Sequence, residues 1–131
     1  MLASLLGALP AAAQQDSKTE AARRADETWL ALVDGGQYPQ SWKDASPAFQ
    51  AAVTQEKWVK ALESIRTPLG SLKSRRLISA NYSTVLPGVP DGEYEVIIFE
   101  TIFEHKPLAN ETVISKLDKD GTWRVAGYYI K

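Results

Sequence analysis

The chain has 131 residues, with 15 Lys or Arg, 16 Asp or Glu, a single His and no Cys. A chain of this length fits one domain that buries about two-thirds of its unfolded surface, and 44% hydrophobic residues are enough for a core. The lack of Cys excludes disulfides, thiolate metal sites and catalysis by Cys. The formal net charge of -1, spread evenly over both halves, argues against nucleic-acid binding.

The first 13 residues form an uncharged apolar run that ends in Ala11-Ala12-Ala13 and precedes a polar segment. Small residues at this boundary are typical of a signal-peptidase site, and the run is shorter than the roughly 20 residues that cross a bilayer. The basic region that normally precedes such a run is missing, so we expect residues 1–13 to be an incomplete Sec signal that starts upstream of Met1. We predict a mature domain of residues 14–131 in the bacterial periplasm or outside the cell, without a membrane or lipid anchor. A short buried N-terminal helix is the alternative for this segment.

The part of the chain before Pro68 has helical patterning, with apolar residues at helical spacing and recognisable caps. Gly35-Gly36 supplies the stop of the first helix, and Ser46 and Thr54 are the expected N-caps of later ones. The last helix must end before Pro68, because Pro disfavours helix in the residue before it. The predicted helices cover residues 17–33, 40–44, 47–53 and 54–67.

After Pro68 the hydrophobic period changes to two, and β-branched and aromatic residues become frequent. Four strands are predicted, over residues 72–84, 93–105, 112–117 and 122–130. The last two are joined by Asp118–Gly121, a tight hairpin signal, and all the connections are short enough to make neighbouring strands antiparallel. The sequence therefore predicts an α+β fold, in which N-terminal helices pack on a four-stranded, curved, cone-like antiparallel sheet.

The long hairpin between the first two strands is expected to turn near Gly88. That centre places Arg76 opposite Glu100 and, by the same register, Ile78 opposite Ile98, Ala80 opposite Val96 and Tyr82 opposite Tyr94. The other face carries Leu77, Ile97, Phe99 and Phe103, so both faces are apolar at the centre of the hairpin. A sheet with one solvated face should alternate apolar and polar residues. We therefore expect the second face to be covered by the curl of the sheet, by a ligand or by a second subunit in a homodimer.

Seven short blocks, in order along the chain, resemble the exported bacterial family known as domain of unknown function 4019. They are Trp29–Gly36, Tyr38–Trp42, Glu56–Val59, Arg66–Gly70, Pro90–Tyr94, Ile98–Thr101 and Asp120–Tyr129. The resemblance extends from about Ala22 to Lys131, and it implies a small exported protein with no assigned activity. The order of helices and sheet, with the terminal Asp-Gly-x-Trp-Arg-Val strand, also resembles the nuclear-transport-factor-2-like (cystatin-like) superfamily. That resemblance implies a sheet wrapped around a long helix, a fold that serves isomerases, dehydratases and binding modules alike.

No catalytic motif, metal-binding set or cofactor loop is present in the sequence. His105 is the only imidazole, and no Gly-rich phosphate loop or nucleophile elbow occurs. Lys73, Arg75 and Arg76 form a basic run, for which a solvated strand is the ordinary interpretation. The pair Arg76–Glu100 is either a structural ion pair or the polar floor of a pocket in which Glu100 acts as a base.

The aromatic residues complete the list of candidates. Trp29 and Trp58 lie at helical spacing and are predicted to be core residues. Other aromatic side chains could line an open cone that holds an apolar ligand. With the ion pair, the candidate pocket residues are Tyr38, Trp42, Arg76, Tyr82, Tyr94, Glu100 and Tyr128.

Three classes of function remain open from the sequence. The favoured one is a non-enzymatic binding or protein-interaction module, whose partner is an unknown protein, a small apolar ligand or a second copy of the chain. The second is a small isomerase- or dehydratase-type enzyme that uses a Glu and a Tyr in the cone. The third is an envelope-stress accessory protein.

Overall fold

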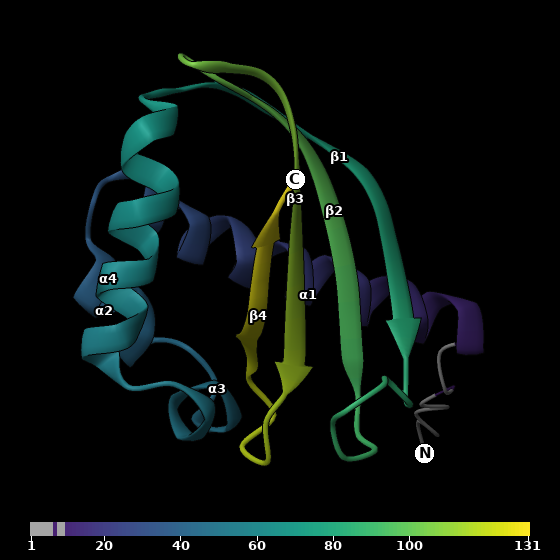
Figure 1. Cartoon of the computed structure of the whole chain (residues 1–131). Helices are drawn as coiled ribbons and strands as arrows, with labels where there is room; N and C mark the ends of the chain where they lie inside the picture. Colours follow the sequence, from purple (N-terminus) through teal and green to yellow (C-terminus); the bar gives the residue numbers. More distant parts are fainter. Residues whose placement is uncertain (1–6, 8–9) are drawn as a thin grey trace, which may run out of the picture.

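The computed structural model describes residue 7 and residues 10–131. Four α-helices and one 3-10 turn precede four strands, which confirms the predicted α+β order (Figure 1). The elements are α1 (Ala11–Asp34), α2 (Tyr38–Lys43), α3 (Pro47–Ala52), α4 (Gln55–Arg66), η1 (Thr67–Leu69), β1 (Leu72–Ser83), β2 (Tyr94–Phe103), β3 (Lys106–Leu117) and β4 (Trp123–Ile130).

Helix α1 is longer than predicted, because it begins at Ala11 rather than at Ser17. The predicted processing boundary before Gln14 therefore falls within its first turn, whereas residues 1–6 and 8–9 of the predicted signal segment lie outside the described residues. The helix stops at Asp34, and Gly36 adopts the left-handed conformation with φ 74°. Among the described residues, no helix has the length and apolar character needed to cross a membrane.

The two predicted N-caps have different outcomes. Thr54 caps α4 as expected, since its hydroxyl accepts a hydrogen bond of 3.3 Å from the backbone N–H of Lys57. Ser46 precedes α3 but makes no capping bond. Its hydroxyl instead donates to Asp118 in the β3–β4 turn at 2.9 Å, so Ser46 occupies the predicted N-cap position but does not cap the helix through its side chain.

The four strands form one antiparallel sheet in the order β1-β2-β3-β4, which is open because its edge strands do not pair with each other. Strand β3 begins at Lys106 and not at the predicted Thr112, because β2 and β3 are joined by a tight turn. Pro107 is the second residue of the strand, and a Pro next to the start of a strand removes only one ladder donor.

The register of β1 on β2 confirms one predicted pair and corrects three. Arg76 lies opposite Glu100 as predicted. A bulge at Ile78 then inserts one residue into β1, so that Ile98 faces Ser79 instead of Ile78. The predicted pairs of Ala80 with Val96 and of Tyr82 with Tyr94 are off by one residue for the same reason; the partners are Ile97 and Glu95. A register counted from the loop cannot detect a bulge inside the strand.

The helices cover one face of the sheet, where α1 crosses behind the strands (Figure 1). This concave side holds the core, in which the helix residues Trp29, Trp58 and Leu62 join Ile97 and Phe99 from the sheet. The rings of Trp58 and Phe49 meet edge to face at a centroid distance of 4.8 Å. Trp29 and Trp58 are 3% and 8% exposed, so both are core residues as predicted.

One end of the concave side is closed by the β2–β3 turn, which folds back onto η1. The backbone N–H of Glu104 donates to the carbonyl of Ser71, and that of His105 to the carbonyl of Leu69, each at 2.8 Å. Gly70 lies between them with φ 75°, and a Cβ added to it would come within 2.7 Å of the Glu104 carboxylate. Only glycine fits this contact without displacement.

The opposite face of the sheet is not covered by the described helices. It carries the alternate residues of β2, β3 and β4 that point away from the core, and we call it the open face. Its apolar members are Val96, Ile98, Ile102, Leu108, Ile114 and Tyr129. Three of them are well exposed, Ile102 at 42%, Leu108 at 63% and Tyr129 at 61%.

Candidate functional site

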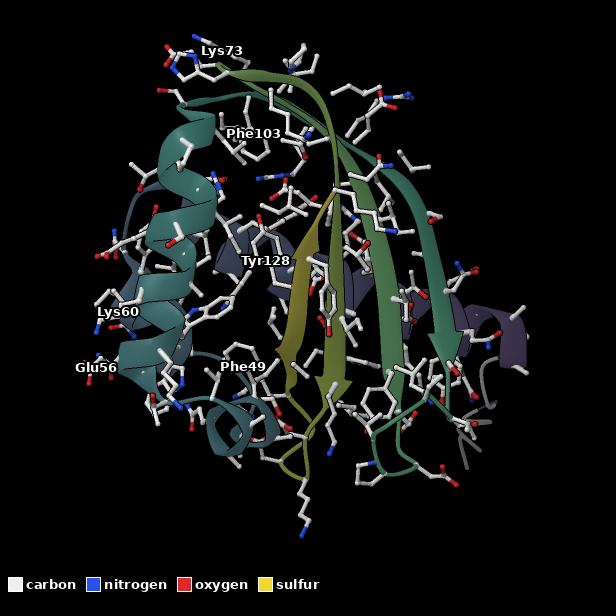
Figure 2. All side chains as sticks on the ribbon, in the orientation of Figure 1. Phe49, Glu56, Lys60, Lys73, Phe103 and Tyr128 are labelled. Atoms are coloured by element: carbon white, nitrogen blue, oxygen red, sulfur yellow. The ribbon has the colours of Figure 1, made fainter. Side chains whose placement is uncertain are left out.

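The concave side contains a network of buried and partly buried polar residues, each contributed by a different element. Its members are Asp34 at the end of α1, Arg66 at the end of α4, Arg75 on β1, Thr101 on β2, Glu111 on β3 and Tyr128 on β4. We call these six residues the interior network. Figure 2 shows Tyr128, together with Phe103, in the space between α4 and the sheet.

Arg75 is the centre of the interior network. Its guanidinium donates to both carboxylate oxygens of Asp34, from Nη1 at 2.8 Å and Nη2 at 3.0 Å, and to Glu111 from Nε at 2.7 Å. The second arginine, Arg66, donates from Nη2 to Asp34 at 2.8 Å. These directional, charge-assisted hydrogen bonds from Arg75 and Arg66 to Asp34 hold the ends of α1 and α4 against the sheet.

Glu111 is fully buried and accepts hydrogen bonds from three side chains. Besides Arg75, it accepts from the hydroxyl of Thr101 at 2.5 Å and from the phenol of Tyr128. The Tyr128 ring also meets Trp29 edge to face at 5.2 Å, which fixes its orientation. Both oxygens of the Glu111 carboxylate are therefore engaged.

The charges of the interior network balance, with two guanidinium groups and two carboxylates. Burial works to raise the pKa of Asp34, but the hydrogen bonds and charges of Arg75 and Arg66 outweigh it and lower the pKa. Burial, with the negative charge of Glu111 next, raises the pKa of Tyr128 well above its ordinary value. The Asp34 carboxylate is consequently ionised, and the Tyr128 phenol neutral, at neutral pH.

One member of the interior network is incompletely satisfied. Arg66 is 4% exposed, and its Nε and Nη1 have no hydrogen-bond partner among the described residues. Its guanidinium carbon, Cζ, lies over the Phe103 ring at 4.7 Å from the ring centroid. Buried donors of this kind normally have an acceptor, so Arg66 marks the point where the site has unused binding capacity.

A second buried polar group lies under α1, nearer to its N-terminus. Asp26 of α1 and Glu95 of β2 are both fully buried, and each has one carboxylate oxygen without a partner among the described residues. The other oxygens accept from Ser115 and, at 2.7 Å, from Thr19. Burial raises the pKa of Asp26 to about 8, with a further contribution from the charge of Glu95. Burial likewise raises the pKa of Glu95, and Asp26 is thus held protonated at neutral pH.

The seven candidate pocket residues do not meet in one place. Tyr38 and Trp42 pack against the core from α2, where the Trp42 indole donates to the carbonyl of Val53 at 2.8 Å. Tyr82 lies at the other end of the concave side and donates to Glu93 at 2.8 Å. Of the seven, only Tyr128 belongs to the interior network.

The remaining three candidates lie away from the interior network. Tyr94 is 2% exposed, and its phenol donates to the carbonyl of Pro90 in the β1–β2 loop at 2.7 Å. Arg76 and Glu100 form the predicted ion pair at 2.9 Å, but on the uncovered side, with side chains that are 72% and 29% exposed. This pair is solvated, so it does not form the floor of a cone pocket.

The sequence did not single out most of the interior network. Asp34, Arg66 and Glu111 stand at separations of 32 to 41 residues from their ionic partners, so no local pattern connects them. Arg75 belongs to the basic run of Lys73, Arg75 and Arg76, for which the sequence predicts a solvated strand. On a strand, neighbouring side chains point to opposite faces, and that rule separates buried Arg75 from exposed Arg76.

Surface grooves occur elsewhere on the molecule. One of about 500 Å³ lies between α1, α2 and the β3–β4 hairpin, with Trp29 and Trp123 in its wall. A second of about 790 Å³ flanks the same hairpin near α3, and a third of about 460 Å³ lies along α4. None of these three grooves is lined by a candidate pocket residue.

The family model described as "Protein of unknown function (DUF4019)" matches residues 25–128. The chain belongs to this family. The matched region of this DUF4019 protein contains the whole interior network together with Asp26 and Glu95. It confirms the family resemblance seen in the sequence, whereas the looser likeness to the nuclear-transport-factor-2-like superfamily stays a prediction.

A solved structure of a chain from Catenulispora acidiphila is similar to the DUF4019 protein, with a TM-score of 0.59 and 10% sequence identity. The similarity covers 90% of this chain and 93% of the other. At that identity it shows a shared fold. No curated protein matches the sequence.

Proposed function

We propose that this DUF4019 protein is a non-enzymatic protein-interaction module of the bacterial periplasm or extracellular space, and that the open face is its binding surface. The observation that carries the proposal is the exposure of Ile102, Leu108 and Tyr129 on one uncovered side of the sheet. Monomeric proteins rarely expose contiguous apolar patches beyond a few hundred Å², and such patches commonly mark interfaces.

The first partner we propose for the open face is a second copy of the chain. A two-fold contact requires a surface that complements itself, and an apolar patch without a large charge of one sign does so. The cross-strand row of Ile98, Thr112 and Tyr129 on the open face carries no charge, and Glu100, which lies between this row and Ile102, is paired with Arg76.

Sedimentation velocity at tens of micromolar tests the homodimer. The wild-type chain should sediment as a dimer, and Leu108→Glu should sediment as a monomer because two carboxylates would be buried at the interface. The control is Val85→Glu in the β1–β2 loop, which changes an equally exposed residue, at 63%, away from the open face. A wild-type chain that stays monomeric over this range would contradict the dimer.

A second candidate function is binding of a small ligand, or acid-base chemistry on it, in the interior network. The specific observation is that two nitrogen groups of buried Arg66 have no hydrogen-bond partner in the part of the chain that the structure describes. Inside the fold, Tyr128 meets Glu111, whereas Glu100, the base considered from the sequence, lies outside. The network is already charge-balanced, so a neutral acceptor such as a carbonyl oxygen suits Arg66 better than an anion.

Thermal unfolding with acetamide or acetate as probes tests this candidate. Acetamide should raise the melting temperature of the wild-type chain more than acetate does, because it supplies an acceptor without an extra charge. Arg66→Met should abolish the acetamide effect. Equal responses of the two chains would assign the unpartnered donors to ordered water instead.

A further inference from the structure

Strand β1 is an edge of the sheet whose outer side is open. It stands first in the strand order, and among the described residues its backbone is hydrogen-bonded only to that of β2. The opposite edge, β4, differs, because the backbone N–H of Ser46 donates to the carbonyl of Val125 at 2.8 Å and covers part of it. An open edge presents a row of backbone groups that another strand can pair with.

The middle of β1 offers side-chain contacts on both faces. Arg76, Leu77 and Ile78 are consecutive and all exposed, although neighbouring side chains on a strand point to opposite faces. Leu77 is 43% and Ile78 is 48% exposed. An added strand would cover apolar surface on each side of the sheet, as in peptide recognition by strand addition.

The charge of β1 is one-sided. Its 12 residues include Lys73, Arg75 and Arg76 but no Asp or Glu. Arg75 points inward and forms ion pairs with Asp34 and Glu111 in the interior network. Lys73, in contrast, has no carboxylate within 4.0 Å among the described residues. Arg76 contacts Glu100 but keeps 72% of its side chain exposed. Lys73 lies at the end of the sheet where β1 begins, far from the outer surface of α4 that carries Lys60 (Figure 2).

These features favour an acidic partner over a second copy of β1. Two β1 edges paired antiparallel about Ser74 and Arg75 would place Lys73 of each copy opposite Arg76 of the other, and like charges across strands are destabilising. Bulges at Lys73 and Ile78 interrupt the regular backbone of β1, and only Ser74–Leu77 between them keeps a regular strand geometry. A partner strand can therefore pair with only a few residues of this edge.

We propose that the outer edge of β1 binds a short, extended, acidic segment of a partner protein by strand addition. Acidic side chains of the segment would lie near Lys73 and Arg76, and its aliphatic side chains would pack on Leu77 and Ile78. This edge adjoins the open face, on the side where Arg76 pairs with Glu100, but strand addition uses the backbone of β1, so the proposal goes beyond the proposed function and does not depend on the homodimer.

Fluorescence anisotropy with three labelled hexapeptides tests the proposal. The probes are an alternating Glu-Val peptide, the matching Lys-Val peptide and a Glu-Val peptide that is N-methylated on every residue, so that neither of its edges can donate backbone hydrogen bonds. The Glu-Val peptide should bind at least about tenfold more tightly than either of the others, since only it has both the charge and the backbone donors. Its affinity should fall as the salt concentration rises.

Variants of the chain locate the contact. Lys73→Glu combined with Arg76→Glu should reverse the preference, so that the Lys-Val peptide binds more tightly than the Glu-Val peptide. The matched control Lys60→Glu reverses another exposed cation and should leave the preference unchanged. Circular dichroism of each variant checks that it is folded.

Three outcomes would overturn strand addition at β1. They are no binding of the Glu-Val peptide at millimolar concentration, equal binding of the N-methylated peptide, and an unchanged preference in the double variant. Sedimentation of the same samples reports the homodimer independently, so failure of one proposal is distinguishable from failure of the other.

Discussion

Asp26→Asn should stabilise the protein at neutral and alkaline pH. The carboxyl group of Asp26 is fully buried under α1, and its unpartnered oxygen lies in a region that also contains the unpartnered oxygen of Glu95. Because Ser115 bonds to Asp26 and lies directly opposite Glu95 on the sheet, the two carboxyl groups are close neighbours. The amide oxygen of an asparagine can still accept the hydrogen bond from Ser115, and its NH₂ group can donate a new hydrogen bond to Glu95.

The magnitude follows from the pKa of Asp26, which burial raises from 3.8 to about 8. Below pH 4 the carboxyl group is protonated in both the folded and the unfolded chain, so its ionisation does not change the free energy of unfolding. Between pH 4 and pH 8 the unfolded chain ionises while the folded chain stays protonated, and about 1.4 kcal/mol of stability is lost per pH unit. Above pH 8 the loss is complete at an upper limit of ~6 kcal/mol.

Urea unfolding followed by tryptophan fluorescence from pH 5 to pH 9 measures this effect. The free energy of unfolding of Asp26→Asn should exceed that of the wild type by an amount that grows up to pH 8 and then levels off. The control Glu27→Gln changes the next residue of α1, a half-exposed carboxylate paired with Arg23, and should follow the wild-type curve within about 0.5 kcal/mol.

Two results would refute this reasoning. The first is an Asp26→Asn chain that is less stable than the wild type at pH 8, which would mean that the ionised carboxylate is stabilised in the fold. The second is a constant difference between the two curves from pH 5 to pH 8, since Asp26 would then release no proton on unfolding in that range.

Further predictions concern the core, the interior network, the turn after η1 and processing. Trp58→Ala should cost about 3 to 5 kcal/mol in urea unfolding, and an unmoved midpoint would show that the ring does not support the core. Glu111→Gln alone should destabilise more than Glu111→Leu combined with Arg75→Met, because the single change leaves a buried guanidinium partly unpaired; the reverse order would contradict a structural role for the pair. Gly70→Ala should cost at least about 1 kcal/mol from its positive φ, and a neutral effect in thermal unfolding would mean that the β2–β3 turn shifts freely. N-terminal sequencing of exported protein should begin at or near Gln14, and recovery of Met1 would exclude cleavage.

Local features of the sequence determined the order of the elements. The turn at Asp118–Gly121, Pro68 and the change of hydrophobic period predicted helices followed by a four-stranded antiparallel sheet, and the structure has that order. These features depend on neighbouring residues and on short connections, which a sequence displays directly. The pairing of Arg76 with Glu100 agrees with the prediction for a different reason, since the bulge at Ile78 offsets a one-residue error in the register next to the loop.

Only the tertiary structure decided which polar residues are buried together. Asp26 and Ser115 are 89 residues apart, and the partners of Arg75 come from α1 and β3. A charged residue reads as exposed in a sequence, since its burial is tolerated only where partners from distant elements converge on it. The curvature of the sheet over α1 and α4 creates that convergence on one face, and it leaves the open face and the edge of β1 exposed on the other side.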